Sequence, residues 1–309
     1  MKIIVLIYLA LTFFPFSCKN DDDIPTEPET PQMPNIVGMN FLISNNSFNE
    51  SYANLKNSLE ANENIKIVAE VNHQANAASV DLDLNPTRVI FFGNPNLGTP
   101  LMQKNQLAGL DLPQKILVYQ DDKKDVFMSY NNTLYLSSRH DVLGVPSLTM
   151  ISGALKNLTT NASGNEVVSM PETSTVDIAE GIVTKTSEQS FDATYAKLQG
   201  VISNNPNLRI IAEVNHQANA ANVGKKLNPT RLLIFGNPNL GTPLMQNAQT
   251  TALDLPQKML VWEDDNKVVH VSYNNPSYLV KRHGITENET VIETISNALN
   301  NLSNAAITE

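Results

Sequence analysis

Apolar and polar positions in this chain follow spacings that change from helix-like to strand-like and back. Between residues 48 and 59, the apolar side chains of Phe48, Tyr52 and Leu59 recur at helical intervals, which predicts an amphipathic helix to about residue 62. Ser47 precedes this segment, and Glu50 follows Ser47 by three residues, which is the spacing of a capping box. The pattern therefore predicts both the helix and its first turn.

Strand-like segments rich in β-branched and aromatic residues surround this helix. A short Ala-rich piece at 74–79 predicts one or two helical turns, and 121–124 (Asp-Asp-Lys-Lys) predicts a hairpin turn. A closing helix carries apolar residues at helical spacing between 148 and 158. The predicted strands are 37–44, 65–73, 88–92, 115–120 and 126–130. This order, β-α-β-β-β-β-α, predicts an α+β domain around a mainly antiparallel sheet that is packed by helices.

The whole order occurs twice. Phe92–Gln103 recurs letter for letter as Phe235–Gln246, and we call these two stretches the marker segments. The repeat continues without a gap from Glu70–His140 to Glu213–His283. The predicted boundaries are a first repeat domain at 36–159, a linker at 160–176 and a second repeat domain at 177–309.

The first 35 residues have the composition of a targeting segment and a tether. A basic start and a short apolar run end at Cys18, and residues 1–17 resemble a bacterial lipoprotein signal peptide. This resemblance implies lipidation of Cys18 and a cell-envelope location, anchored by lipid to the outer membrane; the acidic run after Cys18 resembles a surface-export signal. An ordinary cleaved signal peptide is the alternative. Residues 18–35, rich in Pro, Glu and Thr, predict a disordered tether.

The net charge and the motifs of the sequence argue against several classes of function. The net charge is −10 and the Lys and Arg residues are scattered, so we expect no nucleic-acid partner. The one cysteine excludes a disulfide framework and a Cys-rich metal site. No serine-hydrolase, Walker or zinc-protease motif is present, so the sequence predicts no cofactor and no metal, and leaves enzymatic activity undecided.

The marker segments, together with Asp111-Leu112-Pro113 and Arg139-His140, resemble the family called domain of unknown function 302. The second copy is more similar, with Asp254-Leu255-Pro256 and Arg282-His283-Gly284. The resemblance implies a β-α-β4-α fold of the TATA-binding-protein-like kind and no established activity. It also implies that single-domain relatives pair as homodimers, so we expect the two copies to pack together as an internal pseudo-dimer.

Each marker segment offers a candidate ligand site. Asn94 and Asn237 stand in Gly-Asn-Pro turns. Thr99 and Thr242 each precede a proline, which predicts that they cap a short helix. A helix beginning there would favour an anion or a carboxylate. The alternative is that these residues only determine the turn and the cap.

Glu70 with His73, and Glu213 with His216, form a second candidate set. Residues three apart on a strand point to opposite faces, so a metal site is disfavoured unless the strand ends or bulges near Asn72. We expect Glu70 to be hydrogen-bonded or paired with Arg88. An acid–base enzyme using Glu213 and His216 is the alternative function, and it requires both side chains to share one cavity.

The third candidate set is Arg139-His140 and Arg282-His283. An arginine beside a histidine can hold an anionic ligand, or it can form a structural salt bridge between the last helix and the sheet. The leading hypothesis from the sequence is a non-enzymatic binding module for a small anionic or polar ligand near these three sets. A structural or interaction role at the cell surface is a further alternative.

Overall fold

The computed structural model describes residues 31–308. The predicted signal peptide, Cys18 and most of the predicted tether lie outside the described residues. Residues from Met33 onward form one compact unit that contains both repeats.

Both repeats have the predicted order of elements, with small helices added. Repeat 1 contains β1 (Met39–Ile43), α1 (Phe48–Glu60), β2 (Lys66–Asn72), α2 (His73–Ala78), β3 (Thr87–Gly93), α3 (Pro95–Lys104), η1 (Gln106–Leu110), β4 (Gln114–Gln120), β5 (Val126–Asn131), α4 (Thr133–Arg139) and α5 (Ser147–Ser163). Repeat 2 contains β6 (Ile182–Ser187), α6 (Phe191–Ser203), β7 (Arg209–Asn215), α7 (His216–Asn222), β8 (Thr230–Gly236), α8 (Pro238–Asn247), η2 (Gln249–Leu253), β9 (Gln257–Glu263), β10 (Val269–Asn274), α9 (Pro276–His283) and α10 (Glu289–Ile307).

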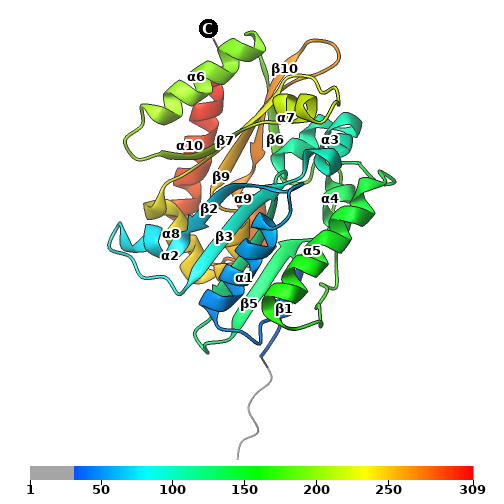
Figure 1. The fold of residues 1–309 in the computed structure, drawn as a ribbon. Coiled ribbons are helices and arrows are strands. Elements are labelled where there is room, and N and C mark those ends of the chain that lie inside the picture. The colour runs from blue at the N-terminus through cyan, green and yellow to red at the C-terminus, as the bar shows by residue number, and fades with distance from the viewer. Residues whose placement is uncertain (1–30, 309) are drawn as a thin grey trace, which may run out of the picture. The chain divides into compact units, whose positions relative to one another are not determined.

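Each repeat builds its own five-stranded antiparallel sheet. The strand orders are β1-β5-β4-β3-β2 and β6-β10-β9-β8-β7, so the two sheets have the same topology. In Figure 1, α1 and α5 lie together at one end of the unit, and α6 and α10 at the opposite end. The predicted α+β class and tandem repeat are confirmed.

Three hydrophobic cores explain this arrangement. Ile90 and Phe92 of β3 point into an outer core with α1 and α5, whereas the alternate residues Val89 and Phe91 point the other way. The core on that second side also contains Leu232 and other residues of repeat 2, so both repeats share it. A third core lies between the second sheet and α6 and α10. The copies therefore pack together as the expected internal pseudo-dimer.

The first turn of α1 matches the sequence prediction. Ser47 caps the helix, and the Glu50 carboxylate accepts a hydrogen bond from the backbone N–H of Ser47 at 3.1 Å. In the linker, Ser169 pairs with Phe41 of β1, which extends the edge of the first sheet by one bridge. Polar residues thus determine where α1 begins, and the linker packs against repeat 1.

Candidate functional site

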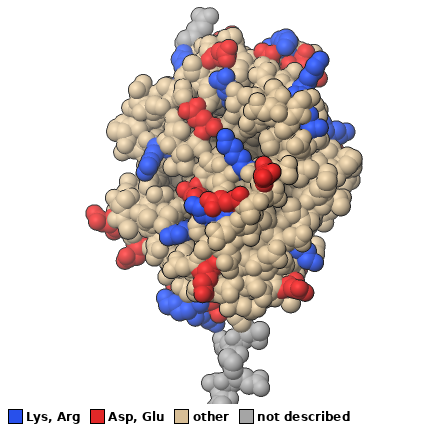
Figure 2. Space-filling view, in the orientation of Figure 1, with Lys and Arg blue, Asp and Glu red and all other residues tan. Residues whose placement is uncertain are grey.

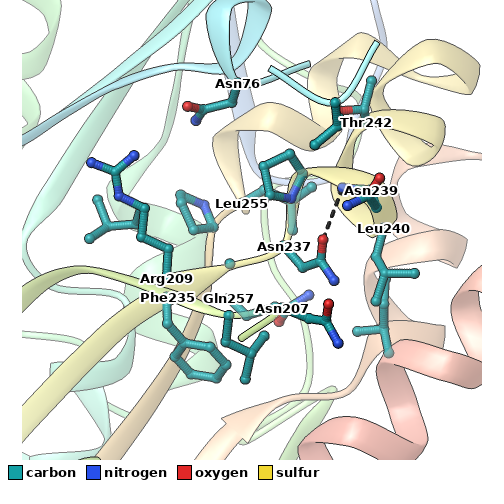
Figure 3. A pocket seen from close by; sticks show the side chains of 18 of the residues that line it. Asn76, Asn207, Arg209, Phe235, Asn237, Asn239, Leu240, Thr242, Leu255 and Gln257 are labelled. Carbon is teal, nitrogen blue, oxygen red and sulfur yellow. Dashed lines mark hydrogen bonds between the residues drawn. The ribbon is translucent and has the colours of Figure 1, made fainter. Parts of the chain in front are cut away.

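Each marker segment lines a pocket whose opposite wall comes from the other repeat. The repeat-2 pocket has a volume of about 320 Å³ and joins the second marker segment to His73 and Asn76 of repeat 1. The repeat-1 pocket has a volume of about 170 Å³ and joins the first marker segment to His216 and Asn219 of repeat 2. Figure 3 shows polar side chains of the repeat-2 pocket, among them Asn76 and Asn237, around one space.

The strands β2 and β7 carry the two histidines across the interface. Each strand ends in an asparagine that caps the next helix, and the histidine is the first residue of that helix. The helix α2 packs against α8, and α7 packs against α3, so each histidine is directed toward the opposing marker segment. The side chains of His73 and His216 are 4% and 5% exposed.

Both histidines are neutral near pH 7. Burial lowers the pKa of His73 and of His216 to about 4, and nearby backbone carbonyls offset this only in part. The Nε2 atom of each ring has no hydrogen-bond partner among the described residues. The backbone of Ala252 and Leu255 hydrogen-bonds to His73, and Nε2 of its neutral ring is left without a partner.

A threonine in each pocket also has a polar atom without a hydrogen-bond partner. Thr99 and Thr242 are 1% and 0% exposed, and neither hydroxyl has a partner within residues 31–308. Each pocket is thus lined by a histidine from one repeat and a threonine from the other, and each of these residues has a buried polar atom without a partner. Unsatisfied buried polar atoms are rare in folded proteins, and such an atom needs an explanation.

The predicted helix start at these threonines is wrong. The helices begin five residues earlier than predicted, at Pro95 and Pro238, and the caps are Asn94 and Asn237. The Gly-Asn-Pro sequence supplies both a side-chain cap and a proline at the first helical position, which is the stronger helix start. Thr99 and Thr242 are instead buried inside the helices.

This correction changes what the helix end can bind. The N–H of Asn239 donates to the Asn237 side chain at 3.0 Å. The N–H groups of Leu240 and Gly241 both donate to the Asn237 carbonyl. The first-turn donors of α8 are therefore occupied, and the anion site expected at this helix end has no free backbone donors.

The Arg-His pairs lie away from both pockets, in the interface between the repeats. Nη1 of Arg139 and Nε2 of His140 both donate to Oδ2 of Asp111, at 2.7 and 2.9 Å. Arg139 also reaches repeat 2, where its Nη2 donates to Oδ1 of Asn274 at 2.9 Å. Lys258 of repeat 2 lies 3.4 Å from Oδ1 of Asp111.

The second pair repeats this geometry with the roles of the repeats exchanged. Arg282 and His283 donate to Asp254 at 2.7 and 2.9 Å, and Lys115 of repeat 1 lies 3.5 Å from the same carboxylate. Arg282 also donates to the Asn131 side chain of repeat 1 at 2.7 Å. All four Arg and His residues are buried. Nδ1 of His283 lies 3.0 Å from the Thr250 hydroxyl, whereas Nδ1 of His140 has no hydrogen-bond partner among the described residues.

The buried carboxylates remain ionised. Burial alone would raise the pKa of Asp111, but Arg139, Lys258 and His140 together hold it well below its usual value. Asp254 has its pKa lowered in the same way, against burial, by Arg282, His283 and Lys115. These charge networks connect the repeats through buried side chains.

The glutamates contact neither the histidines nor the pockets. Glu213 accepts hydrogen bonds from the Tyr195 hydroxyl at 2.6 Å and from Gln199 at 2.8 Å, both on α6. Glu70 is held in the same way by Tyr52 and Lys56. It is therefore hydrogen-bonded, which was one of the two expectations, and its ion pair is with Lys56 and not with Arg88. In the structure, Glu213 and His216 do not share a cavity.

Sequence reasoning missed several residues of these sites. In the sequence, Asp111 and Asp254 stand out only as part of a family motif, and Lys115 and Lys258 carry no signal beyond their position in a strand. Gln114 and Gln257, which line the pockets, follow the Leu-Pro motif directly. The exact recurrence of Asp-Leu-Pro-Gln-Lys in both copies was the available signal.

Within residues 31–308, no group of three or more His, Cys, Asp or Glu side chains is arranged to hold a metal ion. Among the same residues, no helix has the length and apolar content needed to cross a membrane. Figure 2 shows basic and acidic side chains interspersed on the face in view.

Comparison with protein families gives a match for each repeat. The family model described as Domain of unknown function DUF302 matches residues 41–158 and 183–302. A crystal structure of an uncharacterized conserved DUF302 protein from Bacillus stearothermophilus is 19% identical, with a TM-score of 0.34. That match covers 41% of this chain and 96% of the other chain.

Curated relatives match over a shorter stretch. A protein named fluoride-specific ion channel FluC 1 from Brucella suis is 38% identical over 108 residues, as is FluC 2 from Brucella melitensis. The matched segments are 35% of this chain and 42% and 40% of those two proteins. The match therefore spans about two fifths of the length of each relative.

Proposed function

We propose that this chain, which belongs to the DUF302 family and carries its domain twice, is a binding module with two sites for small polar or anionic molecules. The observation that carries the proposal is the make-up of each pocket. A marker segment of one repeat faces a buried histidine of the other, and both sides bring a polar atom without a partner. Each site is thus formed only when the two repeats are packed together.

The energetic argument is the cost of leaving those atoms unpaired. A buried polar group without a partner costs roughly 1–3 kcal/mol of stability. A ligand that hydrogen-bonds to Nε2 of His73 and to the Thr242 hydroxyl would recover this cost on binding. The symmetric pair, His216 and Thr99, gives the second pocket the same capacity.

A thermal-shift screen of residues 33–309 against small acids, alcohols and anions tests the proposal. Fluoride belongs in the screen, because the Brucella relatives are named for it. We expect at least one compound to raise the melting temperature, and calorimetric titration of the best hit to give up to two molecules per chain. His73→Phe should abolish binding in the repeat-2 pocket only, and His216→Phe in the repeat-1 pocket only.

The matched controls are Glu70→Gln and Glu213→Gln, which replace carboxylates outside both pockets. These variants should bind as the wild type does, because α1 and α6 side chains already engage both carboxylates. Loss of binding in Glu213→Gln with unchanged binding in both histidine variants would contradict the proposal. That result would place the binding site at Glu213, outside both pockets.

A further inference from the structure

We propose that the two pockets take compact ring-shaped or alkyl molecules bearing a single hydroxyl or carboxyl group, and that the repeat-2 pocket admits the larger ones. This inference rests on the proposed function, because it names the ligand class of the same two sites. The inference is drawn from three properties of the pockets: the side chains that line them, their polar groups and their volumes.

The walls of both pockets are mainly apolar. In the repeat-2 pocket, Phe235 and Leu255 come from the sheet side, and Ile295 and Leu299 come from α10. The repeat-1 pocket has the equivalent apolar lining from its own sheet and from α5. Apolar walls with few polar groups are typical of sites for small organic molecules, whose body is desolvated on binding.

The polar groups in the pockets suit one uncharged or singly charged head group. Inside the repeat-2 pocket, His73 is neutral and Thr242 offers one hydroxyl. The only charged side chain lining this pocket is Arg209, which is exposed. Its counterpart in the repeat-1 pocket is Lys66. A phosphate group needs several donors at once, and the occupied first turn of α8 supplies none.

The volumes separate the two sites by ligand size. An apolar cavity of about 150 Å³ holds a benzene molecule. The repeat-1 pocket, at about 170 Å³, therefore suits a single ring, and the repeat-2 pocket, at about 320 Å³, suits two fused rings. The larger pocket extends along the end of α2 to Ser79 and Val80, whereas no equivalent residues of α7 line the smaller one.

Two equivalent alanines provide a matched pair of variants. Ala298 on α10 lines the repeat-2 pocket, and Ala154 on α5 lines the repeat-1 pocket. Both are partly exposed on their helices, so phenylalanine can replace either one without disturbing a fully buried core position. Each variant fills one pocket and leaves the other unchanged, and its melting temperature reports whether it has folded.

Isothermal titration of residues 33–309 with benzoate, phenol, 1-naphthoate and inorganic phosphate tests the inference. We expect benzoate and phenol to bind two molecules per chain, 1-naphthoate to bind one, and phosphate to bind none. Ala298→Phe should weaken 1-naphthoate at least tenfold and leave one benzoate site. Ala154→Phe should remove the other benzoate site and leave 1-naphthoate binding unchanged.

Some results would overturn the ligand class and leave the binding function in place. One such result is that phosphate or fluoride binds in a histidine-dependent way while the ring compounds do not bind. Another is that two molecules of 1-naphthoate bind per chain. Unchanged 1-naphthoate affinity in a folded Ala298→Phe protein would also overturn the inference. Failure of every compound in the wider screen would instead contradict the proposed function itself.

Discussion

Lys115 is the residue whose charge should make this fold most sensitive to pH. Burial and the neighbouring Lys258 lower the pKa of Lys115 to about 7, although Asp254 and Asp111 partly oppose this. In the unfolded chain the pKa of lysine is about 10.4, so the unfolded state binds more protons between these values. Stability from this group should therefore rise with pH above 7, by up to about tenfold in the unfolding constant per pH unit.

Urea unfolding at several pH values between 6.5 and 9.5 measures this slope. The matched variant is Lys115→Met, which keeps an unbranched side chain of similar length and removes the titrating amine. The pH slope of the wild type should be clearly steeper than that of the variant. Equal slopes would show that Lys115 keeps an ordinary pKa at the interface between the repeats.

Contacts between individual side chains were also the feature that the sequence predicted least well. The pairing of Arg139 with Asp111 joins residues 28 positions apart, and that of Lys258 with Asp111 joins different repeats. Neither pairing has a local spacing rule, because both depend on how two sheets stack. The sequence therefore identified Arg139 and Arg282 as notable but left open whether they bind a ligand or a structural partner.

At the scale of elements, the start of α8 gives a direct test of the corrected cap. Asn237→Ala should cost roughly 0.5–2 kcal/mol, because its side chain accepts the Asn239 N–H at the helix start. Thr242→Val should cost nothing or stabilise slightly, because it replaces a buried hydroxyl without a partner by a methyl group.

Chemical denaturation of both variants under identical conditions decides between the two helix starts. If Thr242 were the cap, as the sequence suggested, the order of the two effects would be reversed. The equivalent pair in repeat 1, Asn94→Ala and Thr99→Val, provides an independent replicate of the same comparison.

The other helices and strands were well predicted, because their sequence patterns are clear. The strands β3 and β4 are apolar on both faces, which marks them as buried strands even without alternation. The α1 pattern and its capping box were equally explicit in the sequence. The helix start was misplaced because each marker segment has two possible caps, an Asn-Pro pair and a Thr-Pro pair five residues later. The spacing of these pairs does not show which of them begins the helix.

At the scale of the whole molecule, the sequence predicts attachment to a membrane through Cys18. This residue lies outside the described part of the chain, so the prediction rests on the signal-like segment before it. We expect the full-length chain, expressed in a bacterium with lipoprotein processing, to partition into the detergent phase of Triton X-114. Cys18→Ser should move it to the aqueous phase, and aqueous partitioning of the wild type would contradict the prediction.

The shared core makes a stronger claim about the whole molecule: neither repeat should be a stable monomer alone. Separation of the repeats would expose apolar residues of the shared core, such as Leu232 and Leu260, together with the charge of Lys258. Lys258 occupies in repeat 2 the position that Lys115 occupies in repeat 1, and both lie beside an aspartate of the other repeat. Two copies of repeat 2 can therefore satisfy each other through Lys258 and Asp254.

We expect residues 177–309 alone to form a dimer in analytical ultracentrifugation, with the same mutual contacts that the two repeats make here. Leu260→Asp in this fragment should prevent the dimer and leave an unfolded or aggregating chain, because it places a charge in the shared core. A folded, monomeric fragment would show that the shared core is dispensable. Such a monomer would also have an incomplete pocket, because the histidine that lines each pocket comes from the other repeat.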